Sequence, residues 1–294
     1  MSETRMKLEP PLRPEFELTQ IEAGETEDVQ RPLSPWERIL NLEWARRLAI
    51  LLVLALAWEF YARHLGNPLL LPTFSQVLVA LYDSLVHGPL LDRILTSLKV
   101  LLTGYGLGLV LSAAFTAFAV STRLGTDLLT TLTAMFNPLP AIALLPIALL
   151  WFGLGMPSLV FVIVHSVLWA VALNTHSGFQ AVSETMRMAG HNYGLRGLRF
   201  VVLVLMPAAM PAILAGMKIG WAFAWRTLIA AELVFGVSSR SGGLGWFIFE
   251  NRNQLQTAEV FAGLFAVILI GLLVESVIFR NIELHTVRKW GMQR

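Results

Sequence analysis

No Asp, Glu, Lys or Arg occurs between Leu128 and Ser183, a stretch rich in Leu, Ala, Val and Phe. So long a charge-free run is stable only where water is excluded, and it has room for two membrane-spanning helices of about 20 residues each. Glycines and a proline at 152–157 predict the turn between them. Over the whole chain 55% of the residues are hydrophobic and 14% are charged, with a mean hydropathy of +0.64. This composition excludes a soluble globule.

Four other apolar runs have the length of membrane spans, at about 48–62, 100–120, 213–235 and 260–279. Backbone amides in hydrocarbon must be paired within their own segment, and none of the runs shows the polar and apolar alternation of a barrel strand. The sequence therefore predicts an all-α membrane protein with six transmembrane helices.

The two ends of the chain are more polar than the predicted membrane spans. Residues 1–36 are acidic and proline-containing, and we expect a disordered cytoplasmic tail there, followed by an N-terminal transmembrane helix with its flanks over 37–69. Residues 70–287 form the expected core and 288–294 a cytoplasmic C-terminal tail. Lys and Arg concentrate before the first span, after the fourth and after the last, which places all three regions in the cytoplasm.

A polar connection joins the fourth and fifth spans. We expect Ser183 to cap a short helix that runs to about Tyr193, Gly194 to end it in the left-handed conformation, and a second short helix to run from Gly197 to Pro207. The connection's arginines, Arg187, Arg196 and Arg199, are expected to face water or a partner protein. Two interpretations remain open, because such a connection either docks a partner or lies at the lipid headgroups.

Polar residues and prolines inside the spans are the candidates for function. Arg226 lies near the middle of the fifth span, where it either contacts an anion or pairs internally with Glu232 or Glu275. The prolines of the third span, Pro138, Pro140 and Pro146, are expected to interrupt its hydrogen-bond ladder. His165 is expected to be a hydrogen-bonded span residue and no ligand or proton carrier.

Two further patterns concern packing. Gly104, Gly108 and Ser112 recur at four-residue spacing on the second span, so another helix approaches closely there, either within the chain or in a homodimer. Residues 73–88 place apolar side chains on one helical face, which predicts an interfacial helix with Thr73 or Ser75 at its start.

The sequence lacks the motifs of several kinds of catalytic and binding site. The chain has no cysteine, no Walker loop for nucleotide phosphates and no serine-hydrolase or zinc-protease motif. We therefore expect no catalytic residue, no metal, no cofactor of its own and no nucleic-acid partner, and any ATP would have to be used by another polypeptide.

Several segments resemble the motifs of a known family. Met188-Ala189-Gly190, then Gly194, then Val204-x-Met206-Pro207 after nine residues resembles the cytoplasmic EAA loop of ABC importer permeases, whose pattern is Glu-Ala-Ala, three residues, Gly, nine residues, Ile-x-Leu-Pro. Residues 137–155 resemble the proline-rich third span of permeases for nitrate, sulfonates and taurine. WRTLIAAE at 225–232, GGLG at 242–245 and VRKW at 287–290 add to the match, which covers about residues 70–290.

The resemblance implies a type I ABC importer permease fold (MetI-like) in a bacterial inner membrane, with both termini cytoplasmic. The partners it implies are two ATP-binding cassette subunits, an external substrate-binding protein and a second permease copy, expected as a homodimer in the lipid bilayer. The coupling segment, at about residues 180–207, would contact the ATPase. Its expected contact residues are Glu184, Arg187, Met188, Ala189, Gly190, Gly194, Arg196 and Pro207. Met188 replaces the family's acidic residue, and Glu184 is the nearest carboxylate.

The pathway residues implied by the resemblance and by the span chemistry are Pro138, Pro140, Pro146, Trp225, Arg226 and Glu232. The solute would be a small anion such as nitrate, a sulfonate or taurine. An ion-coupled secondary carrier is the alternative, but it would need internal acidic or histidine relays and usually repeated halves, neither of which is clear here.

Overall fold

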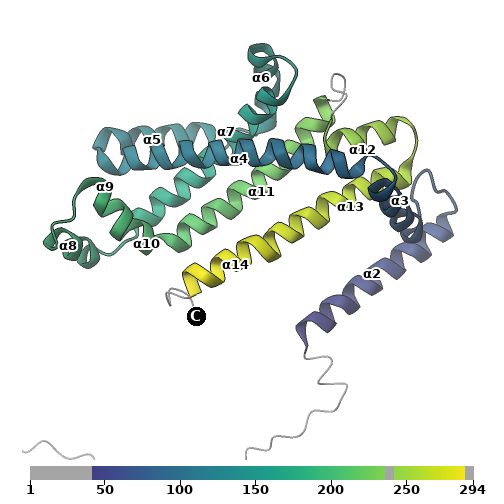
Figure 1. Cartoon of the computed structure of the whole chain (residues 1–294), viewed down its shortest axis with the longest axis horizontal. Coiled ribbons are helices and arrows are strands. Elements are labelled where there is room, and N and C mark those ends of the chain that lie inside the picture. The colour runs from purple at the N-terminus through teal and green to yellow at the C-terminus, as the bar shows by residue number, and fades with distance from the viewer. Residues whose placement is uncertain (1–41, 236–241, 289–294) are drawn as a thin grey trace, which may run out of the picture. The chain divides into compact units, whose positions relative to one another are not determined.

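The computed structural model describes residues 42–235 and 242–288, and within these ranges all regular structure is helical (Figure 1). The chain divides into two compact units, residues 1–54 and 55–294, and the contacts described below lie in the second. The helices, with 3₁₀ and π segments marked η, are α2 (Glu43–Leu65), α3 (Phe74–Val86), α4 (Leu90–Ser121), α5 (Arg123–Phe136), η1 (Ala141–Leu144), α6 (Leu145–Phe152), α7 (Met156–Gln180), α8 (Glu184–Asn192), α9 (Gly197–Phe200), η2 (Val201–Leu205), α10 (Met206–Ala208), α11 (Met210–Phe235), α12 (Leu244–Asn253), α13 (Thr257–Leu273), η3 (Val274–Phe279), α14 (Arg280–Glu283) and η4 (Leu284–Arg288).

Four helices in the described ranges are long and apolar enough to cross a membrane, namely α2, α4, α7 and the continuous stretch Thr257–Thr286. Two bent pairs raise the number of spans to six if each counts as one: α5 with η1–α6, bent by 89°, and α9–α10 with α11, bent by 79°. Each apolar run predicted to span the membrane falls on one of these helices, so the prediction of an all-α membrane protein is confirmed. The predicted tail at 1–36 lies outside the described residues, as do residues 289–294.

Prolines explain one of the two bends. Pro138 and Pro140 lie between α5 and η1, and proline both lacks an N–H and disfavours helix at the preceding residue, so the helix ends there. The predicted interruption by these two prolines is confirmed. Pro146 lies in the first turn of α6, directly after η1 ends, and at that position the proline's missing N–H costs the helix no hydrogen bond.

Helices α4, α7 and α11 form the core through close glycine contacts. A Cβ on Gly104 would lie 2.8 Å from Cβ of Ile163, and one on Gly108 would lie 2.7 Å from Cβ of Val167. Only glycine lets α4 approach α7 so closely. Of the two interpretations of this glycine pattern, packing within the chain is therefore the one that the structure supports.

The predicted helix at 73–88 is present as α3. Thr73 caps its start with a capping box. The Thr73 hydroxyl accepts from the Gln76 amide at 3.2 Å, and the Gln76 side chain accepts from the Thr73 amide at 3.0 Å. Phe74 then packs edge-on against Trp58 and lies 5.8 Å from the ring centre of Phe265 on α13. An aromatic cluster thus holds α3 against α13.

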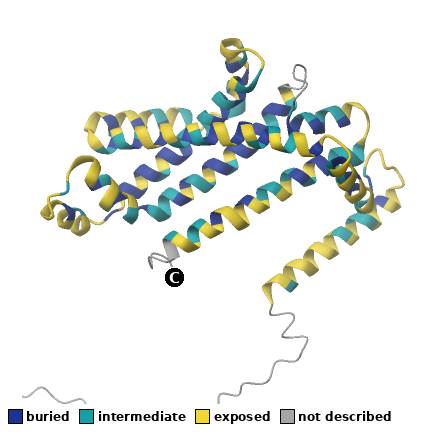
Figure 2. Cartoon of the chain, in the orientation of Figure 1, coloured by how far each residue is buried: buried dark blue, intermediate teal, exposed yellow. Residues whose placement is uncertain are grey.

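Many large apolar residues of the second unit are exposed along its helices, at positions that are yellow in Figure 2. On α4 the exposed fractions of Leu102, Val110 and Leu111 are 58%, 66% and 44%. Soluble proteins rarely expose so continuous an apolar surface, whereas lipid chains cover it without loss of free energy. The exposed apolar surface and the long apolar helices therefore both indicate a membrane protein.

Candidate functional site

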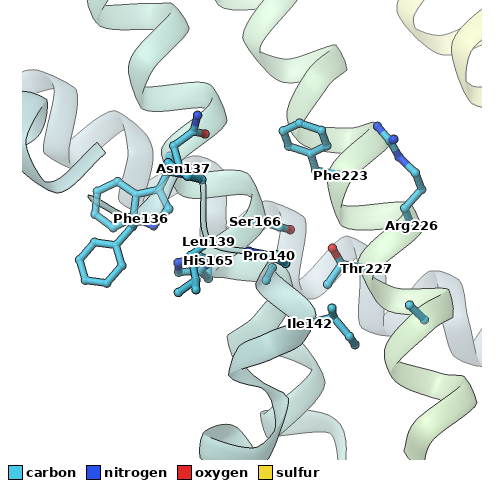
Figure 3. Close-up of a pocket in the computed structure, with 14 residues that line it drawn as sticks. Phe136, Asn137, Leu139, Pro140, Ile142, His165, Ser166, Phe223, Arg226 and Thr227 are labelled. Atoms are coloured by element: carbon cyan, nitrogen blue, oxygen red, sulfur yellow. The ribbon is translucent and has the colours of Figure 1, made fainter. Parts of the chain in front are cut away.

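A cavity of about 330 Å³ opens where the third span is broken, between the end of α5, η1, α7 and α11. Figure 3 shows Phe136 and His165 on one side of it and Phe223, Arg226 and Thr227 on the other. We call it the α5–α7–α11 cavity. Its polar lining residues are Asn137, His165, Ser166, Trp169, Arg226 and Thr227, and Pro138 and Pro140 also line it.

Arg226 is the charged group of this cavity. Its Nε donates to the Ala222 carbonyl of the preceding turn at 3.0 Å, and its guanidinium carbon lies 5.3 Å from the centre of the Phe223 ring. Such a cation over an aromatic face is weakly attractive. In the described part of the chain Arg226 forms no ion pair. The alternative that it pairs with Glu232 or Glu275 is therefore wrong for this structure, and its two terminal amino groups remain available to an anion.

Three of the predicted pathway residues lie elsewhere. Trp225 is buried in the hydrophobic core with 7% of its surface exposed, Pro146 is exposed on α6, and Glu232 is buried further along α11. None of the three lines the cavity. Their place on a transport pathway stays a prediction.

Glu232 instead fastens the start of α12 to α4. The Ser97 hydroxyl, on α4, donates to both carboxyl oxygens of Glu232 at 2.7 and 2.9 Å, and the Gly245 amide donates to one of them at 2.8 Å. The Leu244 amide in turn donates to the Ser97 oxygen at 2.8 Å. A Cβ on Gly243 would overlap the Glu232 and Ser97 oxygens, so glycine is required there. We call this arrangement the Glu232–Ser97 clamp.

Sequence reasoning missed two residues of the cavity. His165 was expected to be hydrogen-bonded, but neither of its ring nitrogens has a partner among the described residues, and that expectation is wrong. Trp169, one turn further along α7, is 7% exposed and its indole N–H also lacks a partner there. Their four-residue spacing, next to Ser166, was the available signal, because it places all three close together on one helix.

The coupling segment has the predicted form of two short helices. Helix α8 ends at Asn192, Gly194 follows with φ = +74°, and α9 begins at Gly197. Gly190 is buried where α8 packs against α9, since a Cβ on Gly190 would lie 2.9 Å from the ring of Phe200, the last residue of α9. Ser183 occupies the position before α8, but its side chain makes no capping bond, so the predicted cap is wrong.

Arg187 departs from its predicted orientation. It was expected to face water or a partner, but its guanidinium turns inward and donates to the backbone carbonyls of Phe179 and, at 3.2 Å, Val182. The Phe179 carbonyl lies in the last turn of α7, where it also accepts from the Val182 amide at 3.3 Å, and the Val182 carbonyl lies just beyond that turn. Arg187 thereby ties α8 to the end of α7.

The outer surface of the coupling segment is apolar and basic. Met188, Tyr193 and Leu198 are exposed by 53%, 86% and 71%, and Arg196 and Arg199 are exposed beside them. Exposed aromatic, methionine and arginine side chains are the residue types that protein interfaces favour. The remaining predicted contact residues are Glu184 and Ala189, which are also exposed, and Pro207, which is half-buried.

The fold and these two regions define a class, a helical membrane permease with a solute-sized cavity and no catalytic constellation in the described residues. The family comparison agrees with this class. Residues 104–283 match the family described as "Binding-protein-dependent transport system inner membrane component", and the chain belongs to that family. Because members of this family are transport permeases, the chain is not an enzyme.

Curated relatives extend the match beyond the family domain. The nitrate import permease protein of Synechocystis sp. is 28% identical over 259 residues, which are 85% of this chain and 92% of the relative. The taurine transport system permease protein of Escherichia coli is 29% identical over 249 residues, 82% of this chain and 88% of the relative. The similarity therefore covers nearly the full length of both relatives.

Proposed function

We propose that this chain is the transmembrane subunit of an ATP-driven importer in a bacterial inner membrane, with its termini in the cytoplasm. It forms the pathway for a small anionic solute that an external binding protein delivers. Two separate ATP-binding cassette subunits supply the energy, and a second copy of the chain completes the pathway. The family description, which names binding-protein-dependent transport, supports this proposal.

The observation that carries the proposal is the construction of the coupling segment. Its inner side is fixed by Gly190 against Phe200 and by Arg187 against the end of α7. Its outer side leaves Met188 and Tyr193 exposed. A surface segment whose inner side is fixed to the protein and whose outer side is apolar is suited to transmit force from a docked protein. Closure of the ATPase pair would displace this segment.

The α5–α7–α11 cavity supports an anionic solute. Among the described residues that line the cavity, Arg226 is the only charged one, and none is Asp or Glu. A guanidinium presents a planar pair of donors that matches carboxylate, sulfonate or nitrate oxygens. Nitrate and taurine, which appear in the names of the two relatives, both carry such oxygens.

The test is reconstitution of the permease with its ATPase subunits in lipid nanodiscs, with ATP hydrolysis measured with and without the loaded binding protein. Arg196→Glu and Gly194→Pro are expected to lose stimulation while the complex stays assembled. Arg123→Glu, at an exposed arginine outside the coupling segment, is the matched control and is expected to retain it. Normal stimulation in both coupling-segment variants would contradict the proposal.

Solute uptake into vesicles distinguishes the importer from the alternative, an ion-coupled secondary carrier. Vesicles that hold the complex should accumulate solute only when ATP is supplied on the side of the ATPase subunits. Accumulation driven by an ion gradient without ATP would favour the secondary carrier and reject the importer.

A further inference from the structure

We propose that the α5–α7–α11 cavity binds a small organic anion with a flat ring, an aromatic carboxylate or sulfonate, and that the ring of the solute takes the place of Phe136 against Trp169. The proposal rests on the proposed transport function and adds to it the chemical class of the solute and the residues that recognise it.

The cavity holds a surplus of hydrogen-bond donors. The Arg226 guanidinium has both terminal amino groups without an ion-pair partner in the described ranges, and the Trp169 indole N–H and the His165 ring are likewise unpaired there. A buried polar group without a partner costs free energy, and native proteins keep few of them. Donors without partners that line one cavity, with no Asp or Glu among its described lining residues, are suited to an acceptor-rich anion.

Aromatic rings form the wall of the cavity. Phe136 stacks on Trp169 with a centroid distance of 5.3 Å and an interplanar angle of 15°, and His165 meets Phe136 edge-on at 6.0 Å. Phe223 adds a ring beneath the guanidinium of Arg226. Flat faces of this kind favour an aromatic solute over an aliphatic one of the same charge.

The size of the cavity also favours an organic solute. A water molecule takes up about 30 Å³ in the liquid, and nitrate has four non-hydrogen atoms, so nitrate alone would leave most of the cavity unfilled. The cavity volume is about 330 Å³. This lies at the lower end of the range for organic ligands, roughly 300 to 1,000 Å³. A single ring with one acidic group fits this space better than an inorganic ion.

Phe136 is the group that moves in this proposal. It is the last residue of α5, directly before the break at residues 137–140, and the helical hydrogen bonds of α5 end with the Asn137 amide. Its ring lies against Trp169, whose N–H is covered in this structure. Rotation of Phe136 away from Trp169 would open the aromatic face and its donor together.

The experiment measures equilibrium binding of three radiolabelled probes to the complete complex in nanodiscs, with the ATPase subunits present and no binding protein. Benzoate is expected to bind most tightly, cyclohexanecarboxylate about tenfold more weakly because it lacks the flat ring, and nitrate more weakly still. Arg226→Gln and Trp169→Phe are each expected to weaken benzoate binding about tenfold, because each removes a donor to a charged group.

Two further variants show whether such losses belong to the cavity. Trp221→Phe changes a buried tryptophan of the core that does not line the cavity, and benzoate binding should be unchanged. Phe136→Ala removes the ring that competes with the solute, and benzoate binding should strengthen a few-fold. A merely structural role of Phe136 would weaken binding instead, and that result would overturn the proposal.

The outcomes separate this inference from the proposed function. If ATP hydrolysis is coupled normally but benzoate binds no better than nitrate, or Trp169→Phe binds it like the unaltered complex, the inference fails and the importer stands. If benzoate binds with the expected dependence on Trp169 and Arg226 in a complex that shows no coupled ATP hydrolysis, the site stands and the importer proposal fails.

Discussion

Replacing Ser97 with alanine is expected to destabilise the permease strongly, because Ser97 is the centre of the Glu232–Ser97 clamp. Its hydroxyl is fully buried, donates to the Glu232 carboxyl at 2.7 Å and accepts from the Leu244 amide at 2.8 Å. Alanine leaves the carboxyl short of a donor and the amide short of an acceptor, and each such buried group costs about 1–3 kcal/mol. The sum is about 2–6 kcal/mol, which corresponds to a fall in apparent Tm on the order of 10 °C.

The assay is thermal unfolding of the purified permease in one detergent, followed by intrinsic fluorescence. Ser121→Ala is the matched control, since Ser121 lies on the same helix, is exposed and donates only to the Ala117 carbonyl one turn earlier. That variant should change stability by less than about 0.5 kcal/mol. A Ser97→Ala protein with the apparent Tm of the Ser121→Ala protein would refute the reasoning.

Three other predictions follow from single contacts. Gly108→Leu should force α4 from α7, because a Cβ already falls 2.7 Å from Cβ of Val167. Overpacking of this kind should give size-exclusion profiles with less monodisperse protein, and an unchanged profile would contradict this. Arg187→Met should free α8 from the end of α7 and speed amide exchange at residues 184–192, whereas equal exchange rates would show that the tether is unimportant. Lys218→Met should cost only about 0–1 kcal/mol, since its pairing with Glu283 is partly exposed, and a larger coupling energy in a double-mutant cycle with Glu283→Gln would overturn that estimate.

Helix positions were predictable from the sequence because lipid imposes a simple rule. A span must be long, apolar and internally hydrogen-bonded, and each of these properties is visible along the chain. The break at Pro138 and Pro140 was predictable for the same reason, since proline acts on its own helix. The form of the coupling segment followed from Gly194, whose φ of +74° is a property of its own backbone. Glycine adopts such a conformation without steric cost.

Side-chain partners were less predictable, because they depend on which helices meet. Arg187 was expected outside, but the carbonyls of Phe179 and Val182 lie within its reach only once α8 folds back. Glu232 was placed on the pathway because a carboxylate in a span suggests function, yet the structure pairs it with Ser97 on a helix far earlier in the chain. His165 was given an ordinary role because the cavity beside it forms between three separate helices.

Helix α7 has one uninterrupted axis from Met156 to Gln180, and Arg187 joins α8 to its last turn. His165, Ser166 and Trp169 lie on the same rod. At the rise of an α-helix, Trp169 is separated from Gln180 by roughly 16 Å. Gly104 and Gly108 of α4 hold α7 at Ile163 and Val167, within one turn of these side chains, so a tilt imposed at the α8 end would rotate them about that point. The stiffness of one helix would thus let a push at the membrane's edge reshape a binding wall deep within it.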